Sequence, residues 1–370
     1  GIQYMKVSLN GILSIAEGMS LEQSFYYHQL ALDLLDSIPP HAMEKMNLDL
    51  EVLIERMKRV NSWITFSGRK MPAIGDTSLI AHVPSEYMPD TDSAFGLKTF
   101  IEGGLSIVKE VKDDRTDHLT MLHRKERAAH GHFDALSITL SHADQPFIID
   151  SGGPYRYGDE LRFTYFMSSL AHNVVLINGK PHKNGAEFLE SKNHGDGMYS
   201  ISALHRGYDP VIHRRHIVYI SGCGVMVLDS IEEVNTKVDL EILWHIHPDC
   251  MMEVNQSRIM LKSEGESMVI HPSQRIQESC SVQSGVLGDS PQGWATRGIA
   301  QKEAISTIIH SLSTDSPITI GTFFQFGDQP ISLIESDRGS GFTVIQGSRR
   351  IELTITEDEV SLHCPPVREE

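Results

Sequence analysis

The chain has 370 residues, and 40% of them are hydrophobic, so it is long enough for two structural units and a large core. Its formal net charge of −17 argues against nucleic acid as a partner, because phosphate binding needs a basic surface. No apolar stretch approaches the roughly 20 residues of a membrane-spanning helix, so no membrane span is expected.

The N-terminal part, residues 1–68, is expected to be a helical segment. Apolar residues follow helical spacing over residues 8–36, and the pair Pro39-Pro40 after them is expected to stop the helix. A second helix is predicted over residues 41–63, because apolar residues recur there at steps of three and four. This pair of helices is too short to be an independent domain.

The remainder predicts a mainly β protein. Residues 69–98 are rich in Gly, Pro, Ser and Asp, which indicates a linker with turns. From residue 99 to 370, short β-branched runs such as FIID (147–150) and GVMVLD (224–229) alternate with turn signals such as Asn178-Gly179. This pattern predicts a large antiparallel β-sandwich after the N-terminal helices.

The four cysteines match no zinc-binding or CxxC spacing; they are Cys223, Cys250, Cys280 and Cys364. Cys223 lies in an apolar run, where a buried free thiol is expected. The even number permits two disulfides without requiring them.

Two imidazoles and one carboxylate follow strand-like runs between residues 130 and 173. On an extended strand, His130 and His132 would project from the same face. Imidazole and carboxylate are good zinc ligands, so we expect zinc at His132, Asp150 and His172, with His130 beside it. The competing interpretation is ordinary: a chain with 19 histidines has chance HxH pairs, and Asp150 alone would suit a turn.

The sequences around these residues are HGHFDALS, FIIDSGG, PYRYGDELRF and AHNVVLINGK, in that order, and LEQSFYYH precedes them. This series resembles the heparinase II/III-like polysaccharide lyases, a superfamily that includes alginate and heparan lyases. The resemblance is specific from His130 to Gly179 and much looser after about residue 250. It implies that residues 1–68 are the end of an α/α toroid and that residues 99–370 are the family's β-sandwich.

The resemblance also implies roles for individual residues. His132, Asp150 and His172 would hold the zinc, while Tyr27 and His130 would be the catalytic pair. Tyr26 is a neighbour of Tyr27 that the motif spacing disfavours.

Further site residues follow from the same resemblance. A second catalytic tyrosine would be Tyr157 or, less favoured, Tyr155. Arg162, His28 and Arg214 are expected to face the substrate, although Arg162 resembles an Arg that could instead be structural. Asp76 lies in an Ile-Gly-Asp sequence similar to one that follows the helices in the family, and it is expected to be positional rather than catalytic.

The implied reaction is β-elimination on a uronic-acid polymer. It requires neutralisation of the uronate carboxylate, a base for the C5 proton and an acid for the leaving oxygen. Tyr27 suits the acid and His130 the base, although Tyr27 could serve as both. The zinc would orient His130 from a structural position, with direct Lewis-acid catalysis as the less favoured alternative.

The substrate and the surroundings of the protein are less specified. The acidic chain favours a modestly charged uronate polymer over a heavily sulfated one. The chain opens on Gly1-Ile2-Gln3 without a signal peptide, and the resemblance implies a periplasmic or secreted bacterial protein. A homodimer is compatible with the sequence but not required by it.

Two competing functions stay open. Only 26 residues precede Tyr27, so the upstream Asn or His with which the family neutralises the substrate carboxylate has no clear equivalent, and a chain that lacks much of the toroid is expected. The first alternative is therefore a non-catalytic glycan-binding β-sandwich with a structural metal. The second is a zinc hydrolase that uses Glu160 or Asp159 as a general base.

Overall fold

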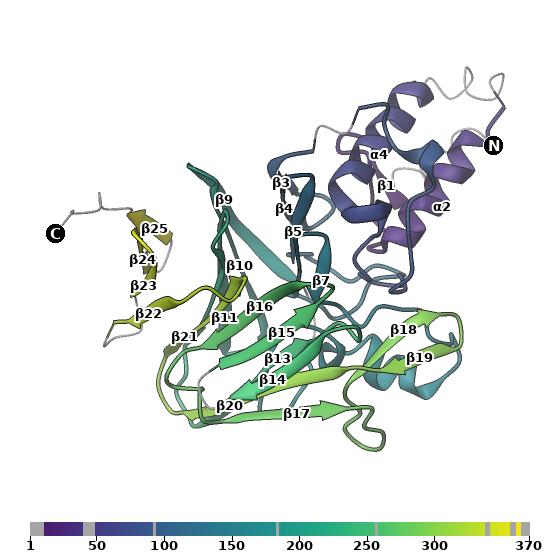
Figure 1. Cartoon of the computed structure of the whole chain (residues 1–370). Coiled ribbons are helices and arrows are strands. Elements are labelled where there is room, and N and C mark those ends of the chain that lie inside the picture. The colour runs from purple at the N-terminus through teal and green to yellow at the C-terminus, as the bar shows by residue number, and fades with distance from the viewer. Residues whose placement is uncertain are drawn as a thin grey trace.

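The computed structural model describes residues 11–39, 49–91, 94–182, 185–255, 258–336, 341–355 and 360–363. The fold is mainly β; among the described residues the α-helices α2 (Phe25–Asp36) and α4 (Leu50–Ile64) lie near the N-terminus, and the strands of every described sheet pair antiparallel (Figure 1). The prediction of a mainly β chain that begins with helices is confirmed. None of the described helices is both long and apolar enough to cross a bilayer.

The α-helices α2 and α4 pack against each other through buried leucines and Met57. Both begin at a side-chain cap: Ser24 accepts a hydrogen bond from the amide of Tyr27, and Asp49 accepts one from that of Val52. These caps hold the first turns in place, so the position of Tyr27 on the first turn of α2 is well defined.

The prediction of a helix over residues 8–36 is wrong for residues 13–24, while residues 8–10 lie outside the described part. Residues 13–20 form a short hairpin of β1 (Leu13–Ser14) and β2 (Met19–Ser20), and α2 begins only at Phe25. Gly18 takes a positive φ of 71° in the hairpin turn, a conformation that helices do not use. The second predicted helix begins at Leu50 where it is described, and residues 41–48 lie outside the described part.

The predicted linker is packed against the rest of the molecule. The 3₁₀ turn η1 (Ser67–Arg69) overlaps its start, η2 (Ser85–Tyr87) lies within it, and its last residues begin strand β3 (Gly96–Phe100). Its apolar residues, including Met71, Ile74 and Val83, are buried in a core shared with α4 and the first strands of the sandwich.

The strands of the described residues form four larger sheets and two hairpins, one of which is the β1–β2 hairpin. The largest sheet has the order β14 (Met251–Asn255), β15 (Arg258–Ser263), β16 (Glu266–Pro272), β21 (Ile318–Phe326), β12 (Gly224–Glu232), β11 (Val211–Ile220), β10 (Met198–Tyr208) and β9 (Ala186–Gly195). A meander follows chain order in β3 (Gly96–Phe100), β4 (Leu105–Lys112), β5 (Arg115–Leu122), β6 (Ile138–His142) and β7 (Gln145–Ile148). A third sheet has the order β17 (Cys280–Ser284), β20 (Ser306–Thr314), β13 (Val238–His245) and β8 (Val175–Ile177). The chain ends in β22 (Ile331–Glu335), β23 (Gly341–Gln346), β24 (Arg349–Ile355) and β25 (Val360–His363), and β18 (Trp294–Gly298) pairs with β19 (Gln301–Ala304).

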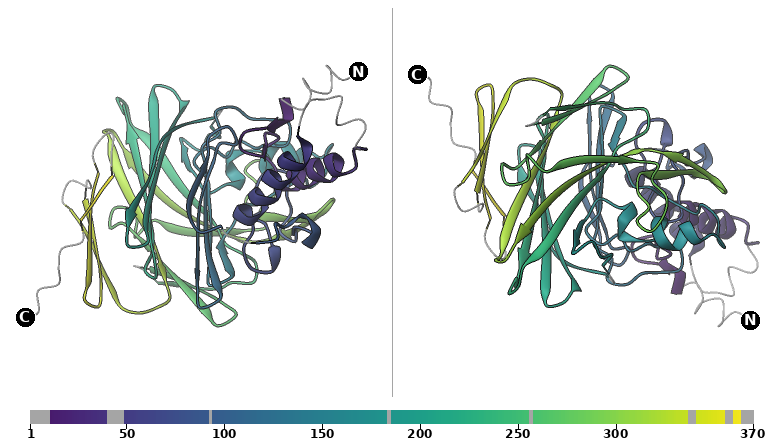
Figure 2. Two further views of the ribbon diagram at one scale, coloured as in Figure 1. Left: turned by 90° about the horizontal axis from the view of Figure 1, so that it is seen from above. Right: turned by 90° about the horizontal axis from the view of Figure 1, so that it is seen from below.

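These sheets stack in three layers, with the C-terminal sheet at the end of the molecule away from the helices (Figure 2). Strand β12 shows why its sequence is apolar without alternation. Val225 and Val227 face the main core, while Met226 and Leu228 face the C-terminal sheet. Because both faces of the large sheet are covered, its central strands bury side chains on both sides.

Two smaller predictions are also confirmed. Asn178 and Gly179 both have positive φ, at 55° and 64°, in the tight turn after β8. Cys223 is a fully buried free thiol, and Cys250 and Cys280 are also free, while Cys364 lies outside the described residues.

Candidate functional site

The candidate site lies where several strands of the sandwich end. His130 and His132 come from the loop between β5 and β6, so the expectation that they lie on a strand is wrong. Asp150 follows the end of β7, and His172 follows the short turn η4 (Ser169–Ala171) just before β8. The loop still turns both rings of the HxH pair toward one carboxylate, that of Asp76.

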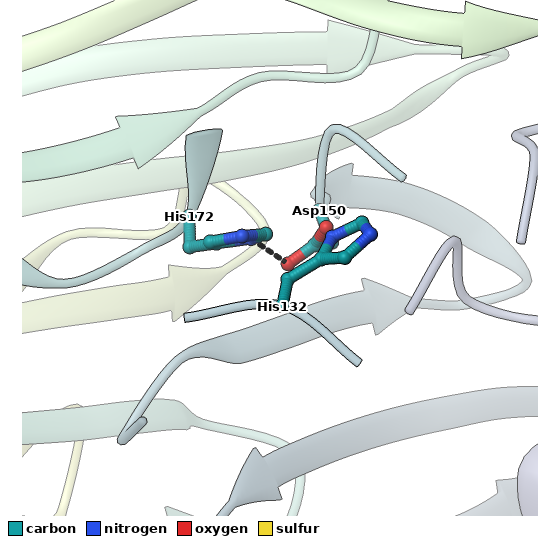
Figure 3. Close-up of side chains that lie close together, drawn as sticks. All are labelled: His132, Asp150 and His172. Atoms are coloured by element: carbon teal, nitrogen blue, oxygen red, sulfur yellow. Dashed lines mark hydrogen bonds and ion pairs between the residues drawn. The ribbon is translucent and has the colours of Figure 1, made fainter. Parts of the chain in front are cut away.

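The predicted metal ligands form one cluster. The ligand atoms of His132, Asp150 and His172 all lie within 4.8 Å of one another, and the three side chains point toward each other (Figure 3). They are almost completely buried, with at most 2% of any of the three residues exposed. A Nδ1–H of His172 donates a hydrogen bond of 2.7 Å to Asp150 Oδ2, and the amide of Gly152 donates to Asp150 Oδ1.

The chemistry of these donors fits a zinc ion. Nδ1 of His132 and Nε2 of His172 are buried nitrogens without a hydrogen-bond partner among the described residues. Burial would raise the pKa of Asp150, but the neighbouring His172 outweighs it and lowers that pKa. Burial also lowers the pKa of His132, which favours the neutral imidazole that a metal needs. Two nitrogen donors and one carboxylate suit zinc better than calcium.

Asp76 connects the two histidines of the HxH pair. Its carboxylate accepts hydrogen bonds from Nδ1 of His130 at 3.0 Å and from Nε2 of His132 at 3.1 Å. Arg162 donates two more, from Nη1 and Nη2, at 2.8 and 2.9 Å. Burial alone would raise the pKa of Asp76, but these hydrogen bonds, first that of His132, hold it well below its usual range. The carboxylate is therefore ionised and only accepts.

At two glycines beside Asp76 the backbone is packed too closely for a larger residue. Gly75 has a φ of 61°, and a Cβ there would lie 2.2 Å from the main-chain oxygen of Gln23 and 2.7 Å from that of His130. A Cβ on Gly153 would lie 2.6 Å from Oδ1 of Asp76. These glycines let three separate chain segments meet at one carboxylate.

The predicted catalytic residues are brought together. The ring of Tyr27 stacks on that of His130, with 3.3 Å between centroids and 13° between planes. The hydroxyl of Tyr27 is 2.7 Å from that of Tyr157, a residue that is 49% exposed. Burial and the hydrogen bond with Tyr27 raise the pKa of Tyr157. Tyr27 and His130 are half-buried, so the pair lies at the surface beside the buried metal cluster.

The two alternative tyrosines lie elsewhere. Tyr26 is exposed and meets Tyr27 only edge to face. Tyr155 is buried in an aromatic cluster with Tyr165 and Phe166. Among the four tyrosines, it is the ring of Tyr27 that stacks on His130, and it is the hydroxyl of Tyr157 that contacts that of Tyr27.

The three residues predicted to face substrate lie in different places. Arg162 is buried on the short π-helix η3 (Arg162–Phe166), bound to Asp76 and with its guanidinium 4.6 Å from the ring centre of Tyr157. His28 is buried between α2 and α4, where its ring bonds the main chain of Ser20 and Met57, and burial lowers its pKa to about 4. Arg214 lies in β11 in an ion pair with Glu232. The structure therefore brings only Arg162 to the site.

Asn173, which the sequence analysis did not single out, holds the surrounding strands. Its amide donates to the main-chain oxygens of Ile138 and Ile149, each at 2.7 Å, and its oxygen accepts from the amide of His245. The only signal was its place directly after His172. It ties the ends of β6, β7 and β13 around the metal cluster.

Comparison with solved structures shows the same fold at low sequence identity. Heparan sulfate lyase HepC from Pedobacter heparinus matches with a TM-score of 0.76 and 13% identity, covering 100% of this chain and 62% of that one. A structure of heparinase III matches with a TM-score of 0.75 and 14% identity, covering 98% of this chain and 62% of that one. The heparinase III from the BT4657 gene product gives 0.74 and 11%, covering 99% and 61%. The chain thus spans about three-fifths of the length of these proteins.

The sequence itself matches a known family. No curated protein matches the chain. The family described as "Heparinase II/III-like, C-terminal" matches residues 110–322, which is more than half of the chain and includes the metal cluster, His130 and Tyr157. The chain therefore belongs to the heparinase II/III-like family, as the motifs between His130 and Gly179 indicated.

Proposed function

We propose that this chain is part of a polysaccharide lyase that cleaves a uronic-acid glycan by β-elimination. The observation that carries the proposal is the stacked pair of Tyr27 and His130, with the hydroxyl of Tyr157 in contact with that of Tyr27. A purely structural metal site has no need of such a half-exposed acid–base pair beside it. The family and the fold support the same class of reaction.

In the proposed reaction, His130 removes the proton at C5 of the uronate. The electron pair of that C–H bond forms the C4–C5 double bond, and the bond from C4 to the glycosidic oxygen breaks. Tyr27 donates its phenolic proton to the departing oxygen, and the proton taken up by His130 then returns to Tyr27, directly or through solvent. Tyr157, in hydrogen-bond contact with Tyr27, would orient that phenol. The two roles can exchange with the stereochemistry at C5.

Zinc would be held by His132, Asp150 and His172. When bound, it would supply a fixed positive charge that fastens the loop after β5 to the ends of β7 and η4. Because the three ligands are buried, the structural role is favoured over water activation. The same burial disfavours a zinc hydrolase, and Asp159 already accepts a hydrogen bond from the amide of Leu161.

The substrate would be an acidic polysaccharide or oligosaccharide. The likeness to heparan sulfate lyase HepC supports a uronate-containing chain, and the net charge of −17 favours modest over heavy sulfation. We include a periplasmic or secreted location in the proposal, because a polymer of this kind does not cross a membrane unaided.

The test is a digestion of uronate polymers of differing sulfation, followed by the ultraviolet absorbance of the unsaturated product. We expect Tyr27→Phe and His130→Ala to lower kcat by about 10²- to 10⁴-fold, the range of general acid–base catalysis. Tyr26→Phe is the matched control and should keep the activity of the parent. Equal activity of Tyr27→Phe and the parent would contradict the assignment.

The competing function, a glycan-binding β-sandwich, predicts a different result. In that case calorimetry would show that the polymers bind, but the chain would form no unsaturated product. Binding would then be insensitive to Tyr27→Phe. That result would replace the lyase proposal.

A further inference from the structure

We propose that Asp76 is a positioning residue that fixes the proton positions of two histidines at once. It sets the proton on Nδ1 of His130, and it sets the proton on Nε2 of His132. The part that concerns His130 as a base rests on the proposed function, whereas the part that concerns His132 does not.

The inference begins with what a carboxylate can do. Asp76 is fully buried and bound by both terminal nitrogens of Arg162, so it is an ionised acceptor without protons to give. Each imidazole nitrogen that faces it must therefore carry a hydrogen. These nitrogens are Nδ1 of His130 and Nε2 of His132.

The consequence differs for the two rings. In His132 the remaining nitrogen, Nδ1, keeps its lone pair; it is buried and has no hydrogen-bond partner among the described residues. This is the nitrogen left to coordinate a metal. In neutral His130 the remaining nitrogen is Nε2, which lies 3.9 Å from Glu22 at the half-exposed side of the ring. This is the nitrogen left to accept a proton.

One side chain, that of Asp76, thus orients both the proposed base His130 and the proposed metal ligand His132. The hydrogen bonds reach Asp76 from residues 54 and 56 positions further along the chain, and Arg162 lies 86 positions away. Arg162 holds the carboxylate in one orientation with a two-point contact, so its two oxygens face different rings. Oδ2 serves His130 and Oδ1 serves His132, and neither ring can exchange its tautomer without losing a buried hydrogen bond.

The primary experiment observes the tautomers directly, without added metal. Long-range proton–nitrogen NMR on the ¹⁵N-labelled full chain distinguishes a protonated from an unprotonated ring nitrogen. In the parent, we expect His130 to be the Nδ1–H form, which is the less common neutral form of free histidine, and His132 to be the Nε2–H form. The opposite tautomer of either ring in the parent would overturn the proposal.

Variants then distinguish the effect of losing the Asp76 carboxylate from a general loss of stability. Asp76→Asn removes the charge but leaves Arg162 buried and unpaired, so Asp76→Asn combined with Arg162→Met is the variant expected to keep the fold. The matched control is Asp117→Asn: Asp117 also accepts a hydrogen bond from an imidazole, that of His142 at 2.7 Å, on the opposite end of β5. The double variant should change the tautomers of His130 and His132, and the control only that of His142.

A second readout uses zinc alone. Chelator competition should show zinc affinity about 10- to 100-fold weaker in the double variant than in the parent, the usual effect of losing the partner of a metal-bound histidine. The Asp117→Asn control should bind like the parent. A folded double variant with parental tautomers and parental zinc affinity would overturn the inference. Neither the NMR readout nor the zinc readout needs lyase activity. A failure of the proposed lyase function can therefore be told apart from a failure of this inference.

Discussion

Arg215 donates a hydrogen bond of 2.6 Å from its guanidinium to the main-chain oxygen of Asn173, the residue that follows His172. The same guanidinium donates to the main-chain oxygen of Leu136 and is held by two hydrogen bonds to Asp229. Arg215 lies in the middle of β11 and is fully buried. The large sheet is therefore bound directly to both loops that carry the proposed metal ligands His132 and His172.

Replacement of Arg215 tests this connection. Arg215→Met should lower the free energy of unfolding by about 3–5 kcal/mol, because it leaves the Asp229 carboxylate buried without its cation. Urea denaturation measures the loss. Arg214→Met is the matched control on the same strand, where a partly exposed pair with Glu232 should cost about 0–1 kcal/mol. Similar losses for both variants would contradict this account.

Gly75 gives a second test, because it lies at the junction beneath Asp76. Gly75→Ala should lower the free energy of unfolding by about 1–3 kcal/mol, since its Cβ would overlap the main chain of Gln23 and His130. Gly68→Ala is the control: its φ of 63° is similar, but no atom lies within 4 Å of its Cβ. Thermal unfolding of the two variants separates backbone strain, which they share, from overlap. An equal effect would show that the close approach is not needed.

Metal binding has its own prediction. We expect the parent, purified without added metal or a histidine tag, to contain about one zinc per chain by plasma mass spectrometry. His172→Ala should lose that zinc, since one of three ligands is removed. His310→Ala is the control, because His310 is equally buried and its ring forms a hydrogen bond with the main-chain oxygen of Ile276, away from the cluster. Metal retained in His172→Ala would exclude the cluster as the site.

The stability of the protein should fall in mild acid. Burial lowers the pKa of His28 to about 4, while an unfolded histidine has a pKa of about 6.5. Between these values the unfolded chain binds a proton that the folded chain does not, so stability is present at neutral pH and is lost as the pH falls below about 6.5. At pH 5, this one group accounts for about 2 kcal/mol.

The measurement compares unfolding free energies at pH 7 and pH 5. In His28→Gln the difference between the two pH values should shrink by about 2 kcal/mol relative to the parent. His363→Gln, at an exposed position, should leave the difference unchanged. A pH dependence of His28→Gln identical to the parent would mean that His28 is not buried as a neutral ring.

The strands were predictable because they depend on local pattern, and the sequence motifs also marked the three residues that cluster at His132, Asp150 and His172. Runs such as GVMVLD are apolar on both faces, and in the structure both faces of β12 are covered. The hairpin at residues 13–20 was not predictable from helical spacing, because its turn depends on Gly18 and on packing against Arg56 of α4. Short strands of this kind are stabilised by tertiary contacts rather than by their own sequence.

The residues that surround the predicted metal ligands were harder to predict from the sequence. Asp76 lies in a stretch of glycines and prolines that indicates a turn, and nothing local shows that its carboxylate meets two histidines and Arg162. The expectation that it is positional came from the family resemblance alone. His28 shows the reverse error: a histidine inside a recognised motif was expected at the substrate, but its ring faces the helix core.

The distances along the chain between Asp76 and its partners, from 54 to 86 residues, set an order of events during folding. Each of these contacts closes a long loop, so none can form early without a large entropic penalty. During synthesis on the ribosome, the carboxylate of Asp76 can pair with Arg162 only after η3 has been synthesised. A zinc ion would therefore bind to the folded protein, and metal uptake should follow folding of the sandwich instead of initiating it.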